Sequence, residues 1–87
     1  MKVDKYLALT QKALAQIRVN AYAKVDAKMI ADDFLDMAQR YFADAKHFKE
    51  QGDLVTAFAA VNYAHAWLDA GARLGVFDVH DSALFAA

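Results

Sequence analysis

The chain lacks cysteine and proline entirely, and both absences limit what it can be. Without cysteine there is no disulfide, no thiolate zinc site and no cysteine nucleophile. Because proline interrupts helices, a chain without it can form long ones. The composition is 59% hydrophobic and rich in alanine, which favours helices packed closely through small side chains.

Neither sign of charge dominates, and no long apolar run is present. Ten Lys and Arg against 11 Asp and Glu give a net charge of −1, so the basic footprint of a nucleic-acid or membrane-surface protein is missing. No segment reaches the roughly 18 uncharged apolar residues of a spanning helix. Residues 1–20 carry charges every few positions, unlike a signal peptide. We expect a soluble, cytoplasmic protein that binds neither nucleic acid nor membrane.

Apolar residues recur at spacings of three and four along three stretches, the pattern of amphipathic helices. We expect these helices over about residues 3–22, 27–51 and 54–74. Asp26 and Asp53 are suited to cap the second and third helices. The third helix has the broadest apolar surface, which predicts it to be the most buried element.

Short connections between these helices force neighbours to run antiparallel. The sequence therefore predicts an all-α fold, an up-and-down antiparallel three-helix bundle in residues 1–76, as a single domain. The short C-terminal tail, residues 77–87, is strongly apolar. It either folds back over the bundle, which keeps its side chains from water, or offers an apolar patch to another chain.

Two polar residues interrupt the apolar stripes of the second and third helices, Asp44 and His65. In a hairpin of these helices, facing residues have numbers that add to about 105, which brings Asp44 and His65 to one level of one seam. Asn62 and Asp69 border this level, and Asp69 could orient the His65 imidazole. These four residues form a candidate polar cluster.

Three interpretations of the cluster compete. A sealed contact that pairs the polar groups and sets the helix register is favoured, because a half-satisfied polar group in a small core is destabilising. A general acid/base site is the second interpretation. A divalent metal held by Asp44, His65 and Asp69 is the third, but helical metal sites use repeated glutamates and this chain has only Glu50. His80 in "DVHD" could bind a metal weakly. We expect no catalytic residue, no resident metal and no cofactor.

Apolar residues of the third helix and of the C-terminal tail suggest an interface with another protein chain. Tyr63 and Trp67 lie one turn apart and form an aromatic pair on the far side of the third helix. Phe77, Leu84 and Phe85 are the large apolar side chains of the tail that could join them. The predicted occupant is a second copy of the chain or another protein.

Two functions follow from these observations. The favoured one is a structural or protein-interaction module without catalytic activity, because the apolar arc exceeds what one three-helix core requires. The alternative is a small-ligand or nucleotide-processing helical protein that uses the Asp44 and His65 cluster.

Residues 41–75, "YFADAKHFKEQGDLVTAFAAVNYAHAWLDAGARLG", combine an aspartate and aromatic residues, a glycine-aspartate turn and an "AF…YAH…LD…LG" helix. The positions concerned are Asp44, Phe48, Gly52, Asp53, Ala57, Phe58, Tyr63, Ala64, His65, Leu68, Asp69, Leu74 and Gly75. This run resembles the archaeal "domain of unknown function 357" family. The resemblance implies a small archaeal cytosolic protein with an up-and-down three-helix fold, and it carries over no activity or catalytic residue. The first helix matches only in its amphipathic character, and the tail after Asp78 lies outside the pattern.

Overall fold

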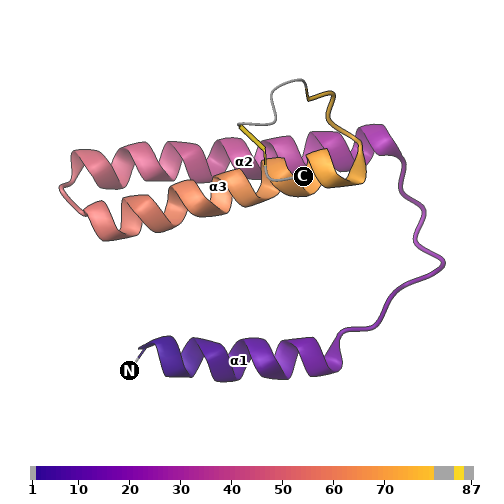
Figure 1. Ribbon diagram of the computed structural model, residues 1–87, viewed down its shortest axis with the longest axis horizontal. Coiled ribbons are helices and arrows are strands. Elements are labelled where there is room, and N and C mark those ends of the chain that lie inside the picture. Colours follow the sequence, from indigo (N-terminus) through magenta and orange to yellow (C-terminus); the bar gives the residue numbers. More distant parts are fainter. Residues whose placement is uncertain (1, 80–83, 86–87) are drawn as a thin grey trace.

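Within residues 2–79 and 84–85, which the computed structural model describes, the chain consists of three helices and no strand (Figure 1). The helices are α1 (Lys2–Gln16), α2 (Ala27–Glu50) and α3 (Leu54–Leu74). Their directions alternate along the chain, so the predicted all-α class and up-down-up order are confirmed. α2 and α3 lie side by side as an antiparallel hairpin.

The predicted end of the first helix, near residue 22, is wrong, because α1 stops at Gln16. The Asn20 side-chain oxygen accepts a hydrogen bond from the Tyr22 backbone N–H at 3.1 Å, and the Asn20 carbonyl accepts one from Ala23 at 3.2 Å. This local turn competes with helix for the same backbone groups. The residues around this turn are exposed, so no tertiary packing would stabilise a longer α1 in place of the turn.

Aspartates cap the N-termini of α2 and α3, as predicted. The Asp26 carboxylate accepts a hydrogen bond from the Met29 N–H at 2.8 Å, and the Asp53 carboxylate accepts one from the Thr56 N–H at 3.1 Å. Each bond satisfies an amide that has no partner within its own helix.

The turn between α2 and α3 is a Schellman motif centred on Gly52. Gly52 has a φ of +79°, in the left-handed region that favours glycine. Its N–H donates to the Lys49 carbonyl at 3.1 Å, and the Asp53 N–H donates to the Phe48 carbonyl at 2.9 Å. Asp53 thus closes α2 and caps α3 at once, which makes the hairpin turn short.

The C-terminal end of α3 repeats this motif and starts the tail back over the helix. Gly75 has a φ of +77°, and the Val76 N–H donates to the Gly71 carbonyl at 3.0 Å. The Phe77 ring then lies directly over Gly71, where any Cβ would overlap it. Gly71 therefore leaves the space into which the tail packs.

The contact between α2 and α3 is made by small side chains, which we call the alanine seam. Its residues, all buried, are Ala38, Ala45, Ala57, Ala60, Ala64 and Gly71. Four of them belong to α3, so the prediction that this helix is the most buried of the three is confirmed. No large side chain among the described residues is fully buried.

Aromatic side chains line one flank of the seam. Phe34 packs edge-on against Trp67 with ring centroids 5.0 Å apart, and Tyr41 stacks on Tyr63 at 5.3 Å. The prediction that Tyr63 and Trp67 lie on the far side of α3 is therefore wrong. They reach across to α2, because both lie only about 60 to 100° around the helix from Ala64. We call this flank the aromatic face.

α1 lies alongside the hairpin without packing against it. Every residue of α1 is exposed, and no Cα atom of α1 lies within 8 Å of α2 or α3. Its apolar side chains, Val3 and Leu7 among them, share only a shallow hollow with Tyr63 of the aromatic face. The Cα radius of gyration is 15.4 Å, against about 12 Å for a compact domain of this length. Closure of residues 1–76 into one packed unit stays a prediction.

The alanine seam predicts a strong asymmetry between two neighbouring alanines. Ala64→Leu should lower the free energy of unfolding by about 1–3 kcal/mol, because a larger side chain in the seam forces the helices apart. Ala66→Leu, at an exposed position of the same helix, is the control and should change it by less than about 0.5 kcal/mol. Urea unfolding followed by circular dichroism measures both. Equal effects would contradict the seam.

The Asp53 cap predicts a pH-dependent contribution to stability. Hydrogen bonds from the Thr56 side chain and backbone hold the pKa of the Asp53 carboxyl below its ordinary value. The pKa of Asp53 is lower in the folded protein than in the unfolded chain. The stabilisation by the cap is therefore fully present above the unfolded pKa of Asp53 and is lost as the pH falls through the folded pKa. The gap in melting temperature between wild type and Asp53→Ala should therefore shrink in acid.

The matched control for the cap is Asp53→Asn, because asparagine caps helices without titrating at this position. It should keep most of the wild-type melting temperature at neutral pH. Thermal melts between pH 7 and about pH 2 test both variants. A gap between wild type and Asp53→Ala that stays constant over this range would refute the contribution.

Candidate functional site

The structure does not bring Asp44 and His65 together. Asp44 is exposed beside the aromatic face, in a hollow of about 180 Å³ shared with Tyr41 and Tyr63. His65 lines a different hollow on the opposite flank of the seam. No hydrogen bond or ion pair joins them, so the predicted sealed contact is not formed. The prediction assumed that α2 and α3 meet along the large apolar residues of their stripes. The helices meet instead along the alanine seam, and this places Asp44 and His65 on opposite flanks.

His65 does pair with Asp69, as the sequence suggested. Its Nε2 lies 3.4 Å from the Asp69 Oδ1, with side chains 48% and 26% exposed. On the other side, the Phe85 ring lies nearly parallel to the imidazole with centroids 6.3 Å apart. The pair can orient the imidazole, but it sits at the rim of a hollow and not in a closed pocket.

The other candidate residues are spread over the hairpin. Asn62 is exposed on α3, one position from the seam-flanking Tyr63. Phe77 and Phe85 are half-buried against α3, whereas Leu84 is exposed. The described residues of the tail therefore fold back. His80 and its neighbour in "DVHD" lie outside the described residues.

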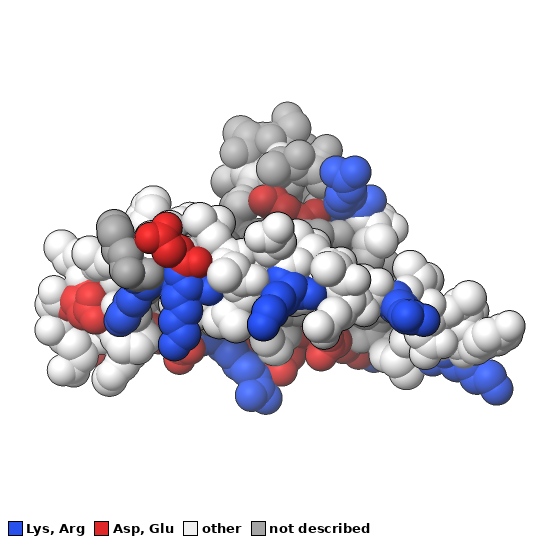
Figure 2. Space-filling view, turned by 90° about the horizontal axis from the view of Figure 1, so that it is seen from below, with Lys and Arg blue, Asp and Glu red and all other residues white. Residues whose placement is uncertain are grey.

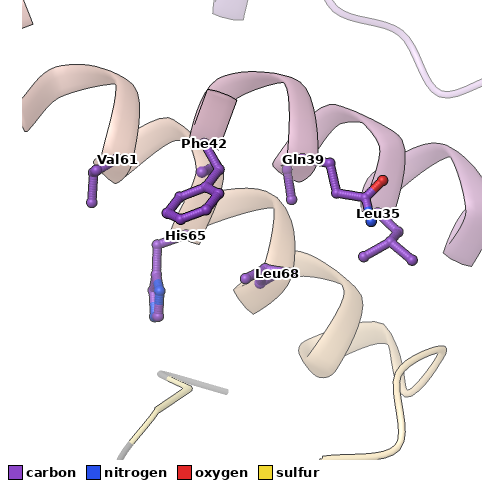
Figure 3. Close-up of a pocket in the computed structure, with 8 residues that line it drawn as sticks. Leu35, Gln39, Phe42, Val61, His65 and Leu68 are labelled. Atoms are coloured by element: carbon purple, nitrogen blue, oxygen red, sulfur yellow. The ribbon is translucent and has the colours of Figure 1, made fainter. Parts of the chain in front are cut away.

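An apolar surface that the sequence did not single out covers the second flank of the hairpin, and Figure 3 shows the part of it beside His65. We call it the groove face, and its residues are Leu35, Phe42, Leu54, Phe58, Val61 and Leu68. Phe58 is 69% exposed, Phe42 55% and Val61 45%. One signal could have found it. Small residues recur every seven positions, at 31, 38 and 45 and again at 57, 64 and 71, which marks the seam and leaves two flanks.

Two hollows make up the groove face, and their walls are apolar. The one beside His65 has a volume of about 360 Å³, and the one toward the hairpin turn about 400 Å³. Lys46 and Lys49 border the second, and the Lys46 ammonium lies 5.2 Å from the centre of the Phe42 ring. A cation at this distance from a ring is attracted to its face. His65, Lys46 and Lys49 are the titratable side chains in these linings, and the other lining residues, apart from Gln39, are apolar, so the surface favours apolar contact.

Other kinds of site find little support in the part of the chain that is described. No three His, Cys, Asp or Glu side chains among these residues come together as a metal site. None of the helices in the described ranges combines the length and apolarity needed to cross a bilayer. On the side shown in Figure 2, Lys and Arg side chains lie among acidic and uncharged residues and form no continuous basic patch.

These features describe a small all-α protein built on an alanine-packed helical hairpin with apolar flanks. The chain matches the family described as protein of unknown function (DUF357) over residues 5–77, and it belongs to this family. The match runs from Lys5 in the first turn of α1 through the hairpin to Phe77 in the tail. No curated protein and no solved structure matches the chain. The family description names no activity.

The separation of Asp44 and His65 predicts that the two residues contribute independently to stability. In a double-mutant cycle with Asp44→Asn and His65→Gln, the coupling should stay below about 0.3 kcal/mol, because the side chains share no partner. Urea unfolding of the four proteins measures it. A coupling of about 1 kcal/mol or more, as expected of a buried contact, would show that Asp44 and His65 interact after all.

Proposed function

We propose that this chain is a cytoplasmic protein-interaction module that binds a helical partner through the groove face and has no catalytic activity. The carrying observation is the exposure of Phe42, Phe58 and Val61 in one continuous apolar surface. Contiguous apolar surface of this kind mostly marks an interaction site in a small protein. A chain without cysteine has no disulfide to lose in the reducing cytoplasm, which is compatible with the proposed location.

The rest of the described chain does not cover the groove face. Side chains of α1 share a hollow with Tyr63, so α1 lies on the side of the aromatic face. Among the described tail residues, Phe85 meets the edge of the groove face, where its ring lies against His65. If α1 closes on the aromatic face, the groove face is still free for a partner.

The shape and charge of the groove face favour a helical partner. The two hollows follow one another along the groove between α2 and α3, which suits the apolar side chains that a helix presents at spacings of three and four. Lys46 and Lys49 at the turn end favour a partner with carboxylates at that end. A partner helix of about 20 residues would span the length of α3, roughly 30 Å.

The alternative, a small-ligand or nucleotide-processing protein, relied on Asp44 and His65 acting together. With those residues on opposite flanks, only His65 and its Asp69 partner remain beside an apolar hollow. The groove face is an open apolar surface with lysines at its turn end and the His65–Asp69 pair at its rim, and contiguous exposed apolar surface of this kind favours protein contact. We therefore favour the interaction module.

A pair of single substitutions tests this function. Phe58→Gln removes an exposed ring from the centre of the turn-side hollow and should weaken partner binding about 10-fold or more. Val55→Gln is the matched control, since Val55 is 83% exposed on the same helix but points away from the seam. Affinity capture with each protein, identification of the bound protein and titration with purified components measure the effect.

The expected result is one saturable partner, another protein or the chain itself, that binds wild type and Val55→Gln equally and Phe58→Gln weakly. Circular dichroism should show all three folded, because both positions are exposed. Absence of any saturable partner, or equal loss in both variants, would count against the proposal.

A further inference from the structure

The geometry points to a second copy of this chain as the occupant of the groove face, seated head to tail across a two-fold axis. This inference rests on the proposed function of that face and names the partner. The two hairpins would form an antiparallel four-helix bundle with α3 over α3 and α2 over α2. Four observations on the groove face support it.

The first observation is the position of the centre of the groove face, through which the two-fold axis would pass. Phe42 and Val61 are shared by both hollows, so they lie at the boundary between the half near the hairpin turn and the half near its open end. The hollows have similar volumes, about 360 and 400 Å³. A two-fold axis through this boundary, running across the helices, places each hollow over the other hollow of the second copy.

The second observation is the complementary relief of the two halves. With Val61 opposite itself, Phe58 of one copy lies opposite Ala64 of the other, and Leu54 lies opposite Leu68. Phe58 protrudes and is 69% exposed, whereas Ala64 is buried on the floor of the hollow beside His65. A ring over a methyl floor between larger walls is the knob-into-hole contact of packed helices.

The third observation is the distribution of charge, which favours one relative direction of the two hairpins. Lys46 and Lys49 both lie in the turn half of the groove face, and Asp69 lies beside the open half. Two hairpins with their turns at the same end would bring four ammonium groups together, which is unfavourable. The head-to-tail arrangement puts the lysines at opposite ends, each pair toward the open end of the other copy. The aliphatic stem of Lys46 then covers Ala38 of the second copy while its charge reaches water.

The fourth observation is size. A hairpin about 30 Å long and about 18 Å wide offers a footprint on the order of 540 Å² per copy. Two copies then bury on the order of 1,100 Å², which passes the roughly 1,000 Å² expected of a specific interface. The described tail stays at the His65 edge, so it borders this footprint without covering Phe42, Phe58 or Val61.

Sedimentation equilibrium and light scattering of the purified full chain test the stoichiometry. Wild type and Val55→Gln should form a dimer, and Phe58→Gln should raise the dimer Kd about 10-fold or more. A wild-type chain that remains monomeric up to about 1 mM would overturn the inference. Circular dichroism of each variant at the same concentration establishes that it is folded.

Single introduced cysteines test the arrangement, because the chain has none of its own. Val61→Cys should cross-link rapidly to itself between copies. Leu54→Cys alone should not, since the head-to-tail arrangement separates the two sites by about 21 Å along the helix. A mixture of Leu54→Cys and Leu68→Cys should cross-link. Self-linking of Leu54→Cys, or a dimer linked only through Tyr63→Cys on the aromatic face, would overturn the inference.

The outcomes separate this inference from the proposed function. A monomer that binds a different purified protein in a Phe58-dependent way overturns the dimer and keeps the interaction module. A monomer that binds no protein overturns both. A dimer that Phe58→Gln weakens and Val55→Gln does not, with the expected cross-links, supports both.

Discussion

The close contact of α2 and α3 through alanine and glycine determines the rest of the structure. Small side chains let two helices approach, and the separation of helix axes follows the size of the side chains between them. Larger apolar residues do not fit in such a seam, so they lie on its two flanks. Ala64 at the centre of α3 is buried, whereas Trp67 and Leu68, one turn later, are only half-buried on opposite sides. The hairpin therefore has two apolar faces instead of one enclosed core.

The two faces differ in what covers them. On the aromatic face, rings from both helices cover each other, with Phe34 on Trp67 and Tyr41 on Tyr63, and α1 lies on this side. On the groove face, Phe58 has no such ring partner in the described part of the chain. A small chain buries a limited share of its apolar surface alone, and a partner that binds only the folded state adds to its stability. Interaction and folding are thus linked in the proposed function.

The match to the DUF357 family defines which residues form the family's structural unit, but it does not say what that unit does. The matched residues 5–77 include most of α1, the linker and the hairpin, so the family unit is larger than the hairpin alone. A second copy on the groove face would leave α1 and the aromatic face on the outside of the dimer. The same fold then offers one surface for self-association and a separate one for α1.

Local chemistry in the sequence determined the helices, the caps and the turn. Asp26, Asp53 and Gly52 act through backbone groups of their immediate neighbours, so their roles could be predicted without the rest of the fold. The rotation of α2 and α3 about their own axes was decided only by tertiary packing. An apolar arc wider than half a helix does not specify its own centre, and the fit of small residues across both helices places it. That choice separated Asp44 from His65 and exposed the groove face.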